Sequence, residues 1–212
     1  MKNPGKIIAF LIILFVFSVV LVLFRDQAIS IDESVFRIIN GLSNPLLNAI
    51  FIPLNYLGST LFWIILVVIF WIKGHKKLSV CLLYSAAINT ILSFSLKWTF
   101  LRQRPSENNV KDILFIEDMG SSFPSGHSGN VFAGNAILSS FSKDWKFKII
   151  FYVLAILTAI SRIYIGVHYP IDTLFGSLIG IIIGNFVLNL PTKNTEGKIE
   201  KSIEKIRKSL KL

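Results

Sequence analysis

Residues 120–130 read Gly-Ser-Ser-Phe-Pro-Ser-Gly-His-Ser-Gly-Asn and lead into a long apolar segment. Pro124 fixes one backbone angle, Ser125 is a residue type that caps helices, and Gly126 permits close backbone approach. These features predict a helix start with His127 in its first turn. The free N–H groups and positive dipole of such a helix end favour an anion, and histidine exchanges protons near neutral pH. Taken alone, the stretch fits an anion site and an ordinary helix start equally well.

The composition places the chain in a lipid bilayer. It has 212 residues, 53% of them hydrophobic, and a mean hydropathy of +0.65, which is too apolar for an ordinary soluble domain. The net charge is +10, but the basic residues are not gathered in a soluble domain, so we expect no nucleic-acid partner. The single cysteine, Cys81, lies in an apolar run. An intrachain disulfide is therefore excluded, and Cys81 is expected to serve packing.

Apolar runs separated by charged loops predict an all-α integral membrane protein with six transmembrane helices in one bundle. Residues 7–24 carry no charge and are followed by Arg25 rather than a small-residue cleavage site, which favours a first span over a signal peptide. The second run, 46–72, is expected to be kinked or broken, because the part after Ser59 is too short to cross a bilayer alone. The other spans are expected at 78–102, from the Pro-Ser-Gly-His turn to 141, up to 165, and at 170–190.

Residues 30–40 predict a short helix that lies at the membrane surface. Ser30 is expected to cap it, Asp32 falls in its first turn, and Gly41 is placed as its stop. In the basic loop after the second span, His75 is expected to be a solvated loop residue.

The distribution of charge predicts the orientation in the membrane. With a cytoplasmic amino terminus, six spans place 15 of the 22 lysines and arginines inside and eight of the 12 acidic residues outside, in agreement with the positive-inside rule. Both termini are therefore expected in the cytoplasm. Residues 1–192 form the membrane domain, and 193–212 form a basic tail. This tail suits an amphipathic helix on an anionic leaflet, although a frayed, solvated tail fits nearly as well.

Charged residues gather at the helix ends that would meet on the outer face. Lys97 ends the third span, His127 begins the fourth, Arg162 is near the end of the fifth and Asp172 begins the sixth. Charges in or near a membrane are costly unless they pair or function. Because Lys97, Arg104 and Arg162 face only Asp172 as a nearby buried anion, a bound oxyanion is expected to supply the missing negative charge.

These residue types suit phosphoryl transfer. Arginine forks match phosphate edges, lysine adds a compact charge, and backbone N–H groups around residues 125–127 add donors. His168 and Asp172 are four residues apart, so the carboxylate is expected to hold one ring nitrogen and leave the other free as a nucleophile. His127 is placed to protonate the leaving oxygen. A purely structural role for both histidines is the less favoured alternative.

Three blocks of sequence resemble the signature of the type 2 phosphatidic acid phosphatase superfamily. They are Lys97 with Arg104-Pro105, Pro124-Ser125-Gly126-His127, and Ser161-Arg162 with His168 and Asp172. The signature region is about 97–172, and the resemblance covers roughly residues 50–190. It implies that His168 is the nucleophile that forms a phosphohistidine, His127 the general acid, and Asp172 the residue that orients His168. It also implies a phosphate site formed by Lys97, Arg104, Ser125, Gly126 and Arg162.

No metal or other cofactor is expected. The resemblance implies a reaction on histidine, and the residues themselves lack the carboxylate and histidine clusters of a two-metal phosphatase.

The resemblance leaves the substrate open. The same signature occurs in soluble vanadium-dependent haloperoxidases, which the apolar spans disfavour. The membrane branch acts on phosphatidic acid, phosphatidylglycerol phosphate and undecaprenyl diphosphate, and an outward-facing site fits recycling of the last of these best. The expected partners are therefore a lipid phosphate and the bilayer, and the oligomeric state is left undetermined.

A non-catalytic lipid-phosphate binding or transport protein is the alternative function. Transport would favour charges near the bilayer midplane, whereas here they cluster at helix ends on one side. A protein that had lost catalysis would be expected to lack His127, His168 or Asp172.

Gly176, Gly180 and Gly184 recur every four residues, in line with Asp172. One face of the sixth helix is therefore small, which predicts close helix packing. Because this face continues from Asp172, packing within the monomer is favoured over a dimer contact.

Overall fold

The structure is a computed structural model that describes residues 25–105, 120–190 and 192–209. Within these ranges the chain consists of helices and connecting loops, without strands. The predicted first span, residues 7–24, lies outside the described residues, as does most of the loop from 106 to 123.

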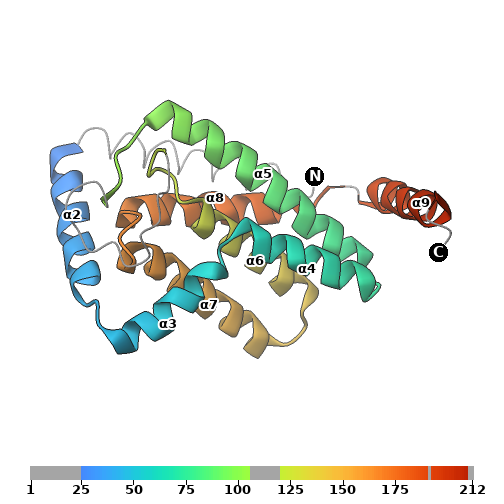
Figure 1. Ribbon diagram of the computed structural model, residues 1–212, viewed down its shortest axis with the longest axis horizontal. Coiled ribbons are helices and arrows are strands. Elements are labelled where there is room, and N and C mark those ends of the chain that lie inside the picture. Colours follow the sequence, from blue (N-terminus) through green and yellow to red (C-terminus); the bar gives the residue numbers. More distant parts are fainter. Residues whose placement is uncertain (1–24, 106–119, 191, 210–212) are drawn as a thin grey trace.

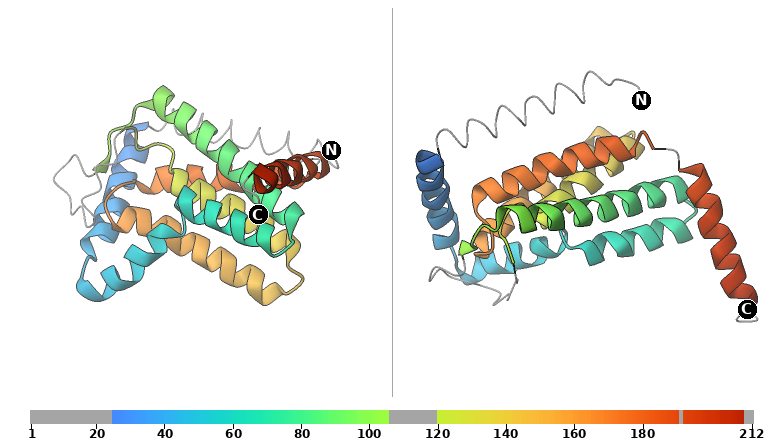
Figure 2. Two further views of the ribbon diagram at one scale, coloured as in Figure 1. Left: turned by 45° about the vertical axis from the view of Figure 1, so that its right-hand side comes forward. Right: turned by 90° about the horizontal axis from the view of Figure 1, so that it is seen from above.

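The helices form an elongated bundle with a distinct helix at each end (Figure 1). α2 (Arg25–Gly41) crosses one end of the bundle, and α9 (Lys193–Ser209) projects from the opposite end (Figure 2). Between them lie α3 (Pro45–Tyr56), α4 (Thr60–Ile72), α5 (Lys76–Phe100), α6 (Gly126–Phe141), α7 (Trp145–Tyr164) and α8 (Pro170–Val187). The central element is α6, which contacts α4, α5, α7 and α8. The Pro-Ser-Gly-His turn therefore leads into the middle of the bundle.

Among the described residues, three helices are long and apolar enough to cross a membrane: α5, α7 and α8. A fourth candidate is the bent pair formed by residues 29–41 and α3, whose axes differ by 116°. The expected break in the run 46–72 is confirmed, because α3 and α4 are separate helices with residues 57–59 between them. That α3 and α4 together form one span stays a prediction. The count of six spans stays a prediction, because the first of them lies outside the described residues.

The ends of α6 and α8 form as the sequence predicts. The Ser125 hydroxyl accepts a hydrogen bond from the Ser128 N–H at 3.3 Å and so caps α6. Pro170 is the first residue of α8, where its missing N–H costs nothing. Asp172 accepts a hydrogen bond from the Tyr169 N–H at 2.9 Å, which closes the first turn. Local side-chain chemistry therefore fixes both helix starts.

The predicted start of the surface helix at Ser30 is wrong. α2 already includes Arg25. The carbonyl oxygen of Ser30 accepts a hydrogen bond from the hydroxyl of Ser34, four residues further along the helix, at 2.7 Å. Asp32 is therefore not at a helix start but in the middle of a helix, and it is only 2% exposed. Its carboxylate binds groups on other elements instead of the backbone of its own helix. The local sequence pattern does not predict such distant partners. The predicted end at Gly41 is confirmed.

Packing within the monomer occupies the glycine face of α8. A methyl group added at Gly176, Gly180 or Gly184 would lie 2.3, 2.3 or 2.7 Å from the carbonyl oxygens of Ser125, Gly129 and Ala133, respectively. These carbonyls belong to α6 and its capping residue, so the two helices approach backbone to backbone. The preference for packing within the monomer is confirmed.

The opposite end of the bundle carries the basic loops and α9. His75 is exposed in the turn between α4 and α5, as predicted. Lys76 forms an ion pair with Glu200, and the Tyr84 hydroxyl bonds that of Thr195, which connects α9 to α5. Cys81 is fully buried in the apolar core, which confirms its packing role.

Candidate active site

The residues predicted to form the site converge at the end of the bundle that α2 crosses. They come from the last turn of α5 (Lys97), the segment after it (Arg104), the first turn of α6 (His127), the last turn of α7 (Arg162), and the start of α8 with the residues before it (His168, Asp172). The imidazole of His127 interacts electrostatically with Arg162, His168, Lys97 and Arg104. Four elements that are distant in sequence thus supply one group of side chains.

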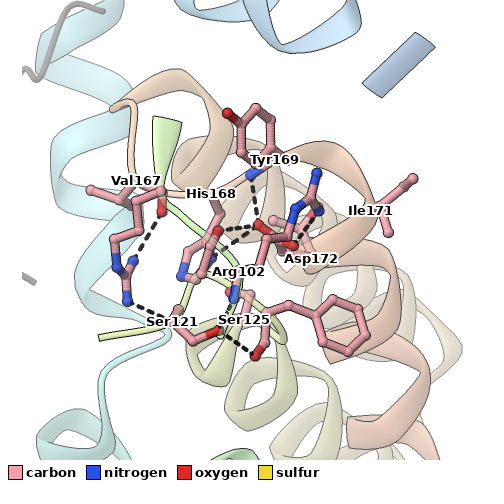
Figure 3. A network of polar contacts seen from close by, with 12 residues as sticks. Arg102, Ser121, Ser125, Val167, His168, Tyr169, Ile171 and Asp172 are labelled. Carbon is pink, nitrogen blue, oxygen red and sulfur yellow. Dashed lines mark hydrogen bonds and ion pairs between the residues drawn. The ribbon is translucent and has the colours of Figure 1, made fainter. Parts of the chain in front are cut away.

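Asp172 is completely buried and surrounded by donors (Figure 3). Its Oδ1 accepts a hydrogen bond from Arg102 at 2.6 Å, and its Oδ2 accepts one from the Tyr169 N–H and one from the Ser122 hydroxyl. Its backbone carbonyl accepts a bond from the Ser125 N–H at 3.0 Å. Asp172 therefore ties the start of α8 to the turn that begins α6.

His168 lies in the loop between α7 and α8 with 2% of its surface exposed. Its Nδ1 is 3.6 Å from Asp172 Oδ2, just beyond hydrogen-bond distance, and has no hydrogen-bond partner among the described residues. Burial lowers the pKa of His168 to about 3, and Arg162 and Arg104 add to this effect against the opposing influence of Asp172. The imidazole is therefore neutral near pH 7. Because Nδ1 is the ring nitrogen near the carboxylate, Nε2 is the nitrogen that a nucleophilic role would use.

Main-chain carbonyls hold two of the predicted phosphate-binding cations. Arg104 donates to the carbonyl oxygens of Gly120 at 3.0 Å, Val167 at 2.9 Å and Ser121 at 3.3 Å. Lys97 Nζ donates to the same Ser121 carbonyl at 2.6 Å. The segment before the Pro-Ser-Gly-His turn and the loop before α8 thus orient these two side chains, which limits the entropy lost when an anion binds.

α3 and the break that follows it also contact the site residues. Arg162 is 1% exposed and donates a hydrogen bond to Asn55 on α3. A methyl group added at Gly58, in the break between α3 and α4, would lie 2.7 Å from Cβ of His127. Asn130 on α6 donates to the Gly58 carbonyl at 3.2 Å. The break therefore allows the backbone to pack closely against His127.

The Ser125 hydroxyl accepts two hydrogen bonds at the start of α6. Its hydroxyl oxygen accepts bonds from the backbone N–H and the hydroxyl of Ser128 at 3.3 and 3.1 Å. A serine hydroxyl has two acceptor positions and one donor hydrogen. No acceptor for this hydrogen appears among the described residues, so it could donate to a ligand at the α6 N-terminus, next to Gly126.

Two charged residues at this site, Arg102 and Asp32, were not predicted from the sequence. The expectation that Asp172 is the only nearby buried anion is wrong, because the carboxylate of Asp32 is also buried there and Arg102 pairs with both acids. The contacts of Asn55 with Arg162 and of Ser122 with Asp172 were not predicted from the sequence either. For Asn55, a polar residue within the apolar run 46–72 was the sequence signal.

Comparison with known proteins identifies the family. The model of the PAP2 superfamily matches residues 78–196, which is more than half of the chain. The chain therefore belongs to the PAP2 superfamily, as the three sequence blocks indicated. Together with its apolar helices, this membership makes it a multi-pass membrane protein.

Similar proteins from this family include lipid phosphatases. The undecaprenyl-diphosphatase of Sulfolobus acidocaldarius is 29% identical over 182 residues, with 84% of this chain and 87% of that protein covered. The lipid A 4'-phosphatase of Porphyromonas gingivalis is 28% identical over 177 residues, with 76% and 73% covered. The crystal structure of the first transmembrane PAP2 type phosphatidylglycerolphosphate phosphatase from Bacillus subtilis superposes with a TM-score of 0.70 at 26% identity, covering 94% of this chain and 98% of that one.

Proposed function

We propose that this protein is a membrane lipid phosphatase that hydrolyses a lipid phosphate or diphosphate through a phosphohistidine intermediate. The observation that carries the proposal is the convergence of a neutral, buried histidine, an adjacent carboxylate and a second histidine with Lys97, Arg104 and Arg162. Membership of a family whose similar members are named as lipid phosphatases supports it.

In the proposed first step, Nε2 of His168 attacks the terminal phosphorus, and the bond from this phosphorus to its bridging oxygen breaks. The leaving group is the lipid alcohol of a phosphate monoester or the lipid monophosphate of a diphosphate. His127 donates a proton to the departing oxygen. Asp172 orients the His168 ring and stabilises the positive charge that develops on it. Lys97, Arg104, Arg162, the Ser125 hydroxyl and the N-terminal N–H groups of α6, beginning at Gly126, bind the phosphoryl oxygens.

In the second step, a water molecule gives a proton to His127 and attacks the phosphohistidine. The bond from phosphorus to nitrogen breaks, inorganic phosphate leaves, and His168 is restored as a neutral imidazole. The chemistry needs positioned donors and a nucleophile, and the side chains named above supply both without a metal or cofactor.

The proposed substrates share a phosphate at the level of the lipid headgroups. They are undecaprenyl diphosphate, phosphatidylglycerol phosphate, phosphatidic acid and a phosphorylated glycolipid of the lipid A type. We favour undecaprenyl diphosphate, because we place the site on the outer face, where that carrier is released. The phosphatase domain comprises residues 1–192, and residues 193–212 form the basic cytoplasmic tail.

The test is phosphate release from these lipids by the full chain in detergent. His168→Ala should lower the rate by roughly three orders of magnitude or more, because it removes the nucleophile. His75→Ala is the matched control, since it makes the same change at an exposed histidine at the other end of the bundle, and it should keep the wild-type rate. Equal rates for the wild type and His168→Ala would show that the catalytic assignment is wrong, and binding without turnover would favour the non-catalytic alternative.

A further inference from the structure

Arg102 is not one of the residues named in the three sequence blocks, yet it connects the buried carboxylates of Asp32 and Asp172. Figure 3 shows its position beside Asp172. Its guanidinium donates to Asp172 Oδ1 at 2.6 Å and to Asp32 Oδ2 at 2.5 Å. Its Cζ lies 4.3 Å from the centroid of the Tyr169 ring, an arrangement in which the ring face attracts the cation. A planar fork can meet two acids and an aromatic face at once, which a lysine ammonium cannot.

Asp32 uses both of its carboxylate oxygens, and one of them binds the start of α8. Oδ2 binds Arg102, and Oδ1 accepts a hydrogen bond from the Ile171 N–H at 2.8 Å. Ile171 is the second residue of α8, where backbone N–H groups have no partner within the helix. A residue of α2 therefore caps the helix that carries Asp172.

Other contacts fix α2 in this position. The Phe36 ring packs edge-on against Tyr169 with centroids 5.4 Å apart, and Asn40 Nδ2 donates to the Tyr164 carbonyl at 2.9 Å. Phe36 is 2% exposed and Asn40 is 5% exposed. Asp32 is thus presented by a helix that is anchored on both sides of the loop containing His168.

The contact with Arg102 constrains the orientation of the Asp172 carboxylate. Because Arg102 binds Oδ1, the other oxygen, Oδ2, faces Ser122, the Tyr169 N–H and Nδ1 of His168. Removing Arg102 would leave Oδ1 as a buried charge without this partner, which is costly and allows the carboxylate to rotate.

We propose that Arg102 and Asp32 are positioning residues for the reaction, which hold the Asp172 carboxylate in the orientation that directs Oδ2 at Nδ1 of His168. This inference rests on the proposed function. The guanidinium of Arg102 binds the two carboxylates, and in the proposed mechanism other groups bind the phosphoryl oxygens. The pair is therefore expected to act on the rate of the chemical step and not on substrate affinity.

The test compares Arg102→Gln, Asp32→Asn and the double variant for kcat, KM and inhibition by inorganic phosphate. Arg102→Gln should lower kcat by about 10- to 100-fold, while KM and the phosphate inhibition constant change by less than about twofold. Asp32→Asn should have a smaller effect, and the double variant should be no slower than Arg102→Gln, since both changes break one chain of contacts. Arg102→Lys should restore activity only in part, because it keeps the charge and loses the fork.

Matched controls lie on the exposed face of α2. Arg37→Gln and Glu33→Gln remove the same charges from exposed side chains and should leave kcat unchanged. A rise in KM and weaker phosphate inhibition in Arg102→Gln, with kcat preserved, would show that Arg102 binds substrate and would overturn the proposal. So would wild-type kcat in both single variants. If Arg102→Gln does not fold, kcat, KM and phosphate inhibition of Arg102→Lys and Asp32→Asn test the positioning role instead. Inactivity of the wild type on every lipid would refute the proposed phosphatase function and not the positioning role alone.

Discussion

At the residue scale, His168 shows how burial sets the chemistry of one side chain. The imidazole is 2% exposed, and its pKa falls to about 3 because a buried cation is poorly solvated and two arginines lie nearby. Asp172 Oδ2 lies 3.6 Å from Nδ1 of His168, close enough to stabilise the positive charge that would develop on the ring in the proposed reaction. A resting neutral ring and an adjacent anion are the combination that a histidine nucleophile needs.

This lowered pKa predicts acid sensitivity of the fold. In the unfolded chain His168 titrates near 6.5, so between pH 6.5 and about 3 the unfolded state binds the extra proton and the folded state does not. The stabilisation is therefore complete above pH 6.5 and is lost as the pH falls, by at most about 1.4 kcal/mol per pH unit. Thermal unfolding in detergent from pH 7 to 5 should show this loss in the wild type and less of it in His168→Gln.

The control for the pH experiment is His75→Gln, which changes an exposed histidine. It should retain the wild-type loss of unfolding temperature on acidification. If His168→Gln and His75→Gln behave identically, protonation of His168 does not oppose folding.

At the element scale, the contact between α6 and α8 positions the candidate site. The glycine face of α8 lies against α6, and the Ser125 N–H donates to the Asp172 carbonyl where the two helices begin. Close backbone packing brings together the capping turn of α6 and the first turn of α8, which carry His127 and Asp172. The geometry of the site therefore depends on the glycines of α8 as well as on its charged residues.

Gly176→Ala should disturb both the packing and the activity. Its new methyl group would lie 2.3 Å from the Ser125 carbonyl oxygen, a backbone atom, so the helices must separate at a cost of about 1–3 kcal/mol. We expect a lower unfolding temperature and a lower kcat. Gly197→Ala is the matched control: no atom lies within 4 Å of its added methyl group on α9, and it should be neutral or stabilising by about 0.5–1 kcal/mol. Equal stability of the two variants would show that the contact tolerates a side chain.

At the scale of the whole molecule, the two ends of the bundle differ in chemistry. One end carries α2, the candidate site and the loops that contain Arg104 and His168, and the other carries the basic turn at residues 73–77 and α9 (Figures 1 and 2). A basic end is expected on the cytoplasmic side. The structure shows that the two ends of the bundle differ, and the orientation of the bundle in the membrane stays a prediction.

Thiol labelling tests that orientation. In a Cys81→Ser background, Gln103→Cys places a thiol at an exposed position near the site, and His75→Cys places one at the other end. A membrane-impermeant maleimide added to intact cells should label Gln103→Cys, and it should label His75→Cys only after the membrane is permeabilised. The opposite pattern would place the site in the cytoplasm.

Local signals explain how much of the fold the sequence predicts. The cap at Ser125, the start at Pro170 and the break before Thr60 each follow from chemistry within a few residues. The start of α2 was mispredicted at Ser30, because Ser30 and Asp32 look like a capping sequence while the partners of Asp32 lie on other elements. Helix ends with local partners are predictable, and those whose polar residues bind distant groups are not.

The sequence by itself determined the helical class, the family and the residues that meet at one end of the bundle, because alternating spans force those helix ends to the same side. Only the tertiary structure decided that Arg102 joins Asp32 to Asp172 and that Asn55 receives Arg162. These partners are 70 and 107 residues apart in the chain. Spacing along a helix constrains neighbours within a few turns, whereas contacts between such distant residues depend on how the helices pack.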